Sequence, residues 1–381
     1  MKLSAGLPPR TPSQRVFVLL LGVLAVLLPA LVAGGQIGRP GSEVEYERLR
    51  EGVAAAQAPS SPATLAARVV YDTTAGDDVA FRLQSNPGST LSRARLAMLF
   101  GTLVIGGLLY LLLSACRGGL TAMFACLALA GLPAVIDEGH VLRPEPLAAV
   151  FGLLGSLLLV AFAFMVMLRR GRGTLRRAVL LTVLMLLVGA AFGVSAAALS
   201  SASVLLLVPA GLVTLAWAVQ TWRWIRLLRR QRLDRRLLAP LARRTWPWFG
   251  LAALGMASTS LVLFVLSQYG VIKTLPSASA FGLLPPFGVR SVLVVVLMGL
   301  GATRLVLESG VHLSARRVHP SLVIVLFVAL SLMHHFLSGA GVSALLPACA
   351  AAMLVGEGTT MALAMFATAL MLRAHRRRKA A

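Results

Sequence analysis

The chain has 381 residues, of which 58% belong to the hydrophobic set AVILMFWYC and only 13% are charged. Soluble domains carry about 25% charged residues. The apolar excess recurs from Val16 to Leu372 in blocks longer than the core helices of a soluble domain, which excludes a soluble globular enzyme, a disordered chain and a disulfide scaffold. With a mean hydropathy of +0.85, the composition predicts an all-α protein, a polytopic bundle of transmembrane helices.

Ten apolar blocks approach the length that a membrane span requires, which is about 20 residues as helix. In chain order they lie at 16–33, 96–115, 120–136, 147–168, 178–199, 204–222, 248–268, 283–303, 321–339 and 343–372. We expect about ten spans, with eight to ten plausible because the third and eighth blocks are interrupted by prolines. The first block favours a retained anchor over a cleaved signal peptide, since Leu31-Val32-Ala33 is a poor small-x-small cleavage site.

The blocks divide the chain into five segments. These are a cytoplasmic N-terminus (1–15), a first transmembrane anchor (16–33), an extracytoplasmic segment (34–95), a multi-span bundle (96–372) and a basic cytoplasmic tail (373–381). With both termini in the cytoplasm, 26 of the 36 Lys and Arg residues face inward and ten of the 13 acids face outward. This asymmetry obeys the positive-inside rule and predicts a protein integral to the cell (cytoplasmic) membrane, with the lipid bilayer as its partner.

The extracytoplasmic segment predicts two small elements. GSEVEYERLREGVAAAQA is typical of a short polar helix. ARVVYDTTAGDDVAFRLQ predicts a β-hairpin, with a turn at Ala75-Gly76-Asp77 and alternation at Val79, Phe81 and Leu83. We therefore expect a small outer helix and β-hairpin that pack on the mouth of the bundle.

An arginine-rich stretch lies between the sixth and seventh blocks and is bracketed by all five tryptophans. It favours either an amphipathic basic helix on the anionic inner leaflet or an ordinary cytoplasmic loop. The residues of this membrane-surface basic face are Arg223, Arg226, Arg229, Arg230, Arg232, Arg235 and Arg236. Because these charges follow the membrane topology, we expect no nucleic-acid partner.

The last two blocks hold the candidates for an ion, proton or ligand site. His334 and His335 lie about 20 Å into the ninth block, and Glu357 lies about 24 Å from the same membrane face in the tenth, at 1.5 Å per helical residue. We therefore expect them to be neighbours, with Thr359 and Thr360 beside the carboxylate. An intramembrane Glu suggests function by default, so one interpretation is a His/His/Glu cluster that binds a cation or relays protons. The other is a protonated Glu357 hydrogen-bonded to His or Thr, which locks two helices.

Enzyme signatures are absent from the sequence: there is no HExxH, GxSxG or Walker loop. No catalytic residue and no cofactor are expected, although a metal at the histidines is left open. Three functions remain: a non-enzymatic sensory, regulatory or scaffold module, which we favour, an ion-coupled secondary transporter that uses Glu357 with His334 and His335, or an intramembrane metalloenzyme.

The stretch from Arg304 to Arg317 between two blocks, and the final LRAHRRRK, carry a resemblance to a known architecture. With a first anchor, a small outer segment and a run of about eight spans, the chain resembles the multi-span membrane sensor half of bacterial receptor kinases and phosphatases. It departs from that family because no kinase, phosphatase or cyclase domain follows Lys379. The resemblance implies an orphan sensor or a module that depends on a cytoplasmic protein partner; the oligomeric state is left open.

Overall fold

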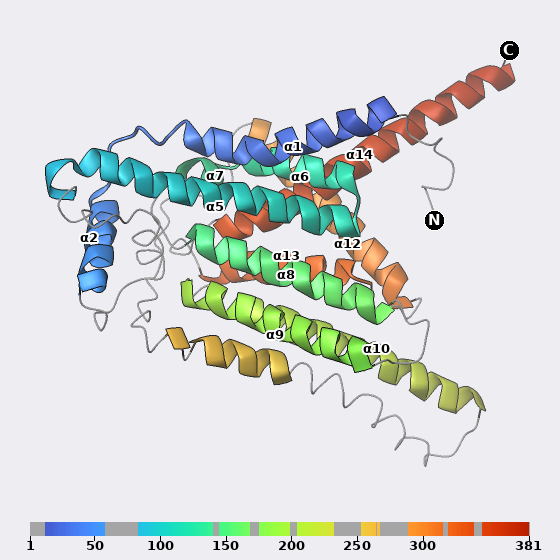
Figure 1. Cartoon of the computed structure of the whole chain (residues 1–381). Coiled ribbons are helices and arrows are strands. Elements are labelled where there is room, and N and C mark those ends of the chain that lie inside the picture. Colours follow the sequence, from blue (N-terminus) through green and yellow to red (C-terminus); the bar gives the residue numbers. More distant parts are fainter. Residues whose placement is uncertain are drawn as a thin grey trace.

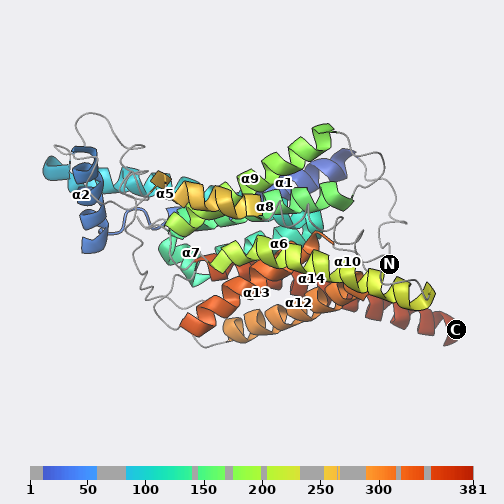
Figure 2. The ribbon, with the colours of Figure 1, turned by 90° about the horizontal axis from the view of Figure 1, so that it is seen from below.

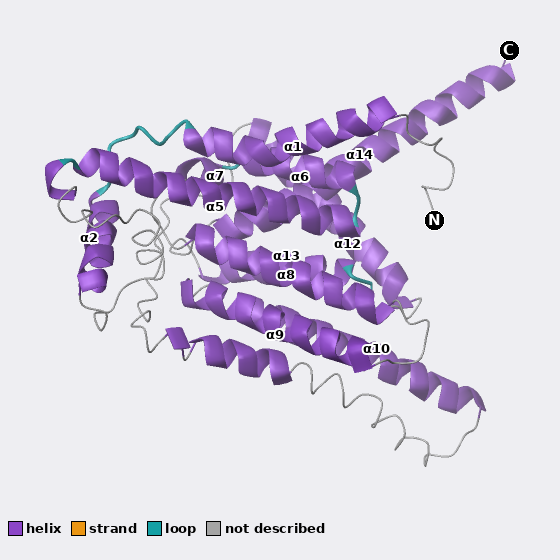
Figure 3. Cartoon of the chain, viewed as in Figure 1, coloured by secondary structure: helices purple, strands orange, loops and turns teal. Residues whose placement is uncertain are grey.

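The protein is a bundle of α-helices in the computed structural model (Figure 3). The structure describes residues 12–57, 83–139, 145–167, 175–198, 204–231, 253–263, 265–266, 289–314, 319–338 and 345–380. Within these ranges no residue forms a β-strand. The all-α fold class is therefore confirmed for the described part of the chain.

The helices follow the apolar blocks closely. They are α1 (Pro12–Gly34), α2 (Glu43–Gln57), α5 (Pro87–Cys116), α6 (Gly119–Ala130), α7 (Pro133–Glu138), α8 (Glu145–Met167), α9 (Leu175–Ala198), α10 (Leu207–Gln231), α12 (Val289–Ser314), α13 (Ser321–Ser338) and α14 (Leu345–Ala380). The predicted short polar helix is confirmed as α2, and its outer placement stays a prediction. The predicted β-hairpin lies almost wholly outside the described residues, and Leu83, at its far end, begins a helical turn instead.

In the part of the chain that the structure describes, five helices are long and apolar enough to cross a membrane. They span Pro87–Cys116, Glu145–Met165, Ala178–Ala198, Arg290–His312 and Leu345–His375. Shorter apolar helices coincide with the other five blocks, at Leu20–Gly34, Gly119–Ala130, Val204–Leu215, Ala253–Leu263 and Ser321–Met333. A multi-pass membrane protein is thereby supported, while the count of about ten spans stays a prediction.

The long helices run side by side, and α2 stands across one end of them (Figure 1). α1 begins, and α14 finishes, at the opposite end, and the perpendicular view agrees (Figure 2). We call these the α2 end and the terminal end of the bundle. An outer segment between two cytoplasmic termini requires α2 to lie at the opposite end of the bundle from the start of α1 and the end of α14. The arrangement of these three helices agrees with that requirement.

Helix α14 is the central element of the bundle. Its first half packs against α6, α12, α13 and α8 and is buried almost completely from Leu345 to Gly358. Small residues dominate there, including a run of three alanines from Ala350 to Ala352. Small side chains let neighbouring helices approach closely in a membrane, where packing rather than the hydrophobic effect drives helix association. The second half of α14 leaves the bundle and is exposed from Leu363 to His375.

Candidate functional site

Glu357 lies where three helices meet. A Cβ atom added to the preceding residue, Gly356, would lie 2.6 Å from the backbone oxygen of Thr121 on α6. One added to the following residue, Gly358, would lie 1.9 Å from the backbone oxygen of Leu297 on α12. Any larger residue at either glycine would push a neighbouring helix away. The Gly-Glu-Gly sequence therefore holds α14 between α6 and α12, with the carboxylate of Glu357 at the crossing.

Four charged side chains converge at this crossing, and we call them the ion-pair cluster: Arg117, Arg304, Glu308 and Glu357. Arg117, between α5 and α6, donates from Nε to Oε1 of Glu357 and from Nη1 to Oε2 of Glu308. Arg304 on α12 donates from Nε to Glu308 Oε1 at 3.1 Å, as their spacing of four residues suggests. Its Nη1 lies 3.2 Å from Glu357 Oε2.

Burial makes this cluster expensive to break. The side chain of Glu357 is 0% exposed and that of Arg117 is 4% exposed. A buried charge is tolerated when it is paired, and here two guanidinium groups balance two carboxylates. Since both oxygens of Glu357 face a guanidinium group, the geometry fits an ionised carboxylate that joins α14 to α12 and to the α5–α6 turn. This favours a helix lock over a proton relay, but the lock is built with arginines rather than with the predicted histidine.

The structure does not bring the predicted histidines to Glu357 among its described contacts. His335 is half-buried and lies one turn before the end of α13. Glu357 lies 12 residues, about 18 Å, beyond the start of α14, which follows α13 by a short connection. His335 therefore lies near the connection between the two helices, whereas Glu357 lies well along α14 from it. The side chain of His334 is outside the described part of the chain.

The two predicted threonines do flank Glu357, with a packing role. Thr359 Oγ1 donates to the backbone oxygen of Val355 at 2.8 Å. Thr360 Oγ1 donates to the backbone oxygen of Gly356 at 2.8 Å and lies 3.1 Å from Thr121 Oγ1 on α6. The second contact ties α14 to α6, one turn beyond the ion-pair cluster.

The basic face is only partly visible. Helix α10 continues through Gln231, so Arg223, Arg226, Arg229 and Arg230 are helical, and Arg226 is exposed. The structure does not describe the side chains of Arg223, Arg229 and Arg230. It does not describe any part of Arg232, Arg235 and Arg236. The amphipathic membrane-surface helix stays a prediction.

A second site lies at the α2 end, where one buried ion pair fixes α2. Ser42 and Glu45 form a capping box, in which the Ser42 backbone N–H donates to Glu45 Oε2 at 3.0 Å. Arg95 on α5 donates to both oxygens of Glu45, at 3.0 and 2.8 Å, and this fork geometry is specific to arginine. Arg95 also donates to the backbone oxygens of Ile37, Arg39 and Pro40, which orders the connection before α2.

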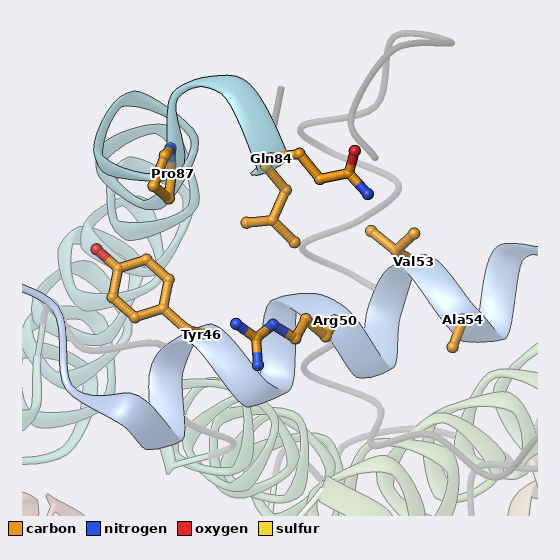
Figure 4. Close-up of a pocket in the computed structure, with 7 residues that line it drawn as sticks. Tyr46, Arg50, Val53, Ala54, Gln84 and Pro87 are labelled. Carbon is orange, nitrogen blue, oxygen red and sulfur yellow. The ribbon is translucent and has the colours of Figure 1, made fainter. Parts of the chain in front are cut away.

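Beside this ion pair is a cavity of about 840 Å³ between α2 and the turn that precedes α5 (Figure 4). It is lined by Tyr46, Arg50, Val53, Ala54, Leu83, Gln84 and Pro87. Figure 4 shows Tyr46 and Arg50 on α2, with Gln84 and Pro87 across the gap from them. Among these described lining residues none is acidic, and they offer hydroxyl, guanidinium and amide donors beside apolar surface. This chemistry suits an anionic group attached to an apolar chain.

Neither arrangement is evident from the sequence alone. The position of Arg117 between two closely spaced apolar blocks is the one signal that points to a buried partner for it. The capping-box pattern of Ser42 and Glu45 is visible in the sequence, but its partner Arg95 is 50 residues away. Within the described residues, no three His, Cys, Asp or Glu side chains come together in a way that could hold a metal ion.

Comparisons with known proteins show the fold alone. No protein-family model matches the chain, and no curated protein does. Among solved structures, the chain is similar to the archaeal oligosaccharyltransferase AglB of Archaeoglobus fulgidus, solved in complex with an inhibitory peptide and a dolichol-phosphate. The TM-score is 0.54 at 12% identity, and the match covers 97% of this chain and 52% of that one. This chain thus spans about half the length of that protein, and its helical bundle resembles part of a membrane enzyme.

Proposed function

We propose that this protein binds a polyprenyl-phosphate lipid in the cavity between α2 and the start of α5, and that it serves a lipid-linked transfer reaction in the membrane. The observation that carries the proposal is the set of anion-binding donors, Tyr46, Arg50 and Gln84, among the described residues that line the cavity. The similarity in fold to an oligosaccharyltransferase that was solved with dolichol-phosphate supports the choice of lipid. The sensory or scaffold role suggested by the sequence stays a prediction.

The lining of the cavity has a polar part and an apolar part, which supports a ligand with two chemically different parts. Arg50 and Tyr46 come from the same face of α2, one helical turn apart, so both can donate to one phosphate group. Arginine matches phosphate geometry because its planar fork donates two parallel hydrogen bonds. Val53, Ala54 and Leu83 offer apolar surface to the first part of an isoprenoid chain.

Binding of dolichyl phosphate to the full-length protein in lipid nanodiscs tests the proposal. Arg50→Gln removes the charge that faces the phosphate, and we expect it to weaken binding about tenfold, which corresponds to about 1.4 kcal/mol. Arg93→Gln is the matched control, since Arg93 is an exposed arginine on α5 that does not line the cavity. Dolichol without the phosphate is the matched ligand. Equal binding of the two lipids, or equal affinity of wild type and Arg50→Gln, would contradict the proposal.

A further inference from the structure

Two histidines lie beside the ion-pair cluster at the terminal end of α12. The rings of His312 on α12 and His319, in the connection to α13, stack with centroids 4.2 Å apart and an angle of 6° between planes. The sequence stretch between Arg304 and Arg317 contains His312, but no spacing in it predicts this stacking.

Hydrogen bonding defines the protonation state of His319 in this conformation. The backbone N–H of Ser321 donates to His319 Nδ1 at 3.2 Å, and Ser321 Oγ lies 2.8 Å from the same nitrogen. A ring nitrogen that accepts a hydrogen bond from a backbone N–H carries no proton of its own. His319 is therefore neutral here, and protonation at Nδ1 would replace this hydrogen bond with two opposed N–H groups.

The groups around His319 also oppose a positive charge on it. Burial lowers the pKa of His319 below its ordinary value of 6.5, and the charges of His312 and Arg117 lower it further, while Glu308 acts in the opposite direction. Among the described residues, these groups come from α12 and from the α5–α6 turn, and Ser321 on α13 contacts the ring as well. A proton on His319 would thus place a new cation next to Arg117, which already holds both carboxylates of the cluster.

We propose that the His312–His319 pair and the ion-pair cluster form a pH-sensitive latch that holds α12 against α14. With His319 neutral, its ring stacks on that of His312, and Arg117 bridges Glu308 on α12 to Glu357 on α14. On acidification, protonated His319 loses its bond from Ser321, repels Arg117 and attracts Glu308. The bridge through Arg117 weakens, and α12 separates from α14 at this end of the bundle.

Helix α12 is well placed for such a movement. Only 17% of its apolar span is buried inside the protein, and its extensive contact is with α14. The exposed half of α14, beyond the cluster, has no described helix packed on it that would restrain it. A change of charge at the ion-pair cluster therefore acts on the contact between α12 and α14, which determines the position of α12.

The latch is tested by the distance between spin labels on α12 and α14 in the full-length protein in nanodiscs. Labels at Val306→Cys and Leu363→Cys use two exposed positions, in a background in which Cys116, Cys126 and Cys349 are replaced by Ala. We expect the distance distribution to shift to longer values between pH 8 and pH 4.5, because the pKa of His319 lies below its ordinary value of 6.5. His319→Asn keeps an acceptor for the Ser321 N–H but does not titrate, so it should show the same short distance at both pH values.

His375→Gln serves as the control, because His375 is an exposed histidine on α14 beyond the cluster, and it should respond to pH like wild type. A wild-type distance that is indifferent to pH would overturn the latch. So would a shift that His319→Asn retains. Neither result depends on lipid binding at the α2 end, so the latch and the proposed function fail separately.

Discussion

The side chain of Glu357 is fully buried, and its two oxygens face the guanidinium groups of Arg117 and Arg304. Transfer of an unpaired carboxylate into such surroundings costs several kcal/mol, so each charge in the cluster depends on the others. A buried pair of this kind adds little stability relative to an apolar replacement, but removal of one member leaves the other unbalanced. At the scale of single residues, the cluster therefore serves to specify which helices meet.

Glu357→Gln tests this dependence directly. The substitution preserves shape and leaves Arg117 buried with half of its counter-charge, so we expect a loss of about 3 kcal/mol in the free energy of unfolding. Denaturant unfolding in detergent micelles, followed by tryptophan fluorescence, measures it. Glu308→Gln should cost less, because the Glu308 side chain is 41% exposed and water replaces part of what is lost. An equal loss of unfolding free energy in the two variants would show that the burial of Glu357 does not determine the cost of removing its charge.

At the scale of elements, glycines decide how α12 packs. The backbones of α12 and α14 cross at Gly301 and Gly358, where an added Cβ would lie 2.0 Å and 1.9 Å from backbone oxygens of the opposite helix. Backbone atoms cannot rotate away as a flexible side chain does, so the two glycines are required for this approach. This close approach of α12 to α14 brings Arg304 within reach of Glu357.

Gly301→Ala and Gly299→Ala form a matched pair on α12. A Cβ at position 299 would meet nothing within 4 Å, so Gly299→Ala should raise stability by up to about 1 kcal/mol through helix propensity. At position 301 the same methyl group must separate α12 from α14, and we expect a net loss of about 1–3 kcal/mol. Unfolding midpoints in one detergent measure both variants. If Gly301→Ala were as stable as Gly299→Ala, the close crossing of α12 and α14 would be wrong.

At the scale of the whole molecule, the sequence predicted the helices far better than their contacts. Each apolar block coincides with a helix, because a chain in a bilayer must satisfy its own backbone hydrogen bonds and does so as helix wherever it is apolar. Contacts between helices carry no such local signal. The sequence marks Glu357 as an intramembrane acid, but its partner Arg117 is 240 residues away, in the turn between α5 and α6. The similar depth of Glu357 and the two histidines along their helices predicted a histidine partner for Glu357. In the structure, the turn after α5 supplies an arginine as the partner instead.

The direction in which the bundle crosses the membrane is the last property that the charges predict. The start of α1 and the end of α14 lie at the terminal end, and α2 lies at the other (Figure 1). Of the 36 basic residues, 26 fall in segments assigned to the cytoplasm, and basic segments resist translocation, so we expect the terminal end to be cytoplasmic.

His375→Cys and Arg93→Cys place single thiols at exposed positions near the two ends, in the same cysteine-free background. A membrane-impermeant maleimide added to intact cells should label Arg93→Cys and leave His375→Cys unlabelled, and inverted vesicles should give the reverse. Labelling of both positions from the same side would contradict the opposite placement of α2 and the termini, and exchanged labelling would show that the ten acids assigned to the outer face lie in the cytoplasm.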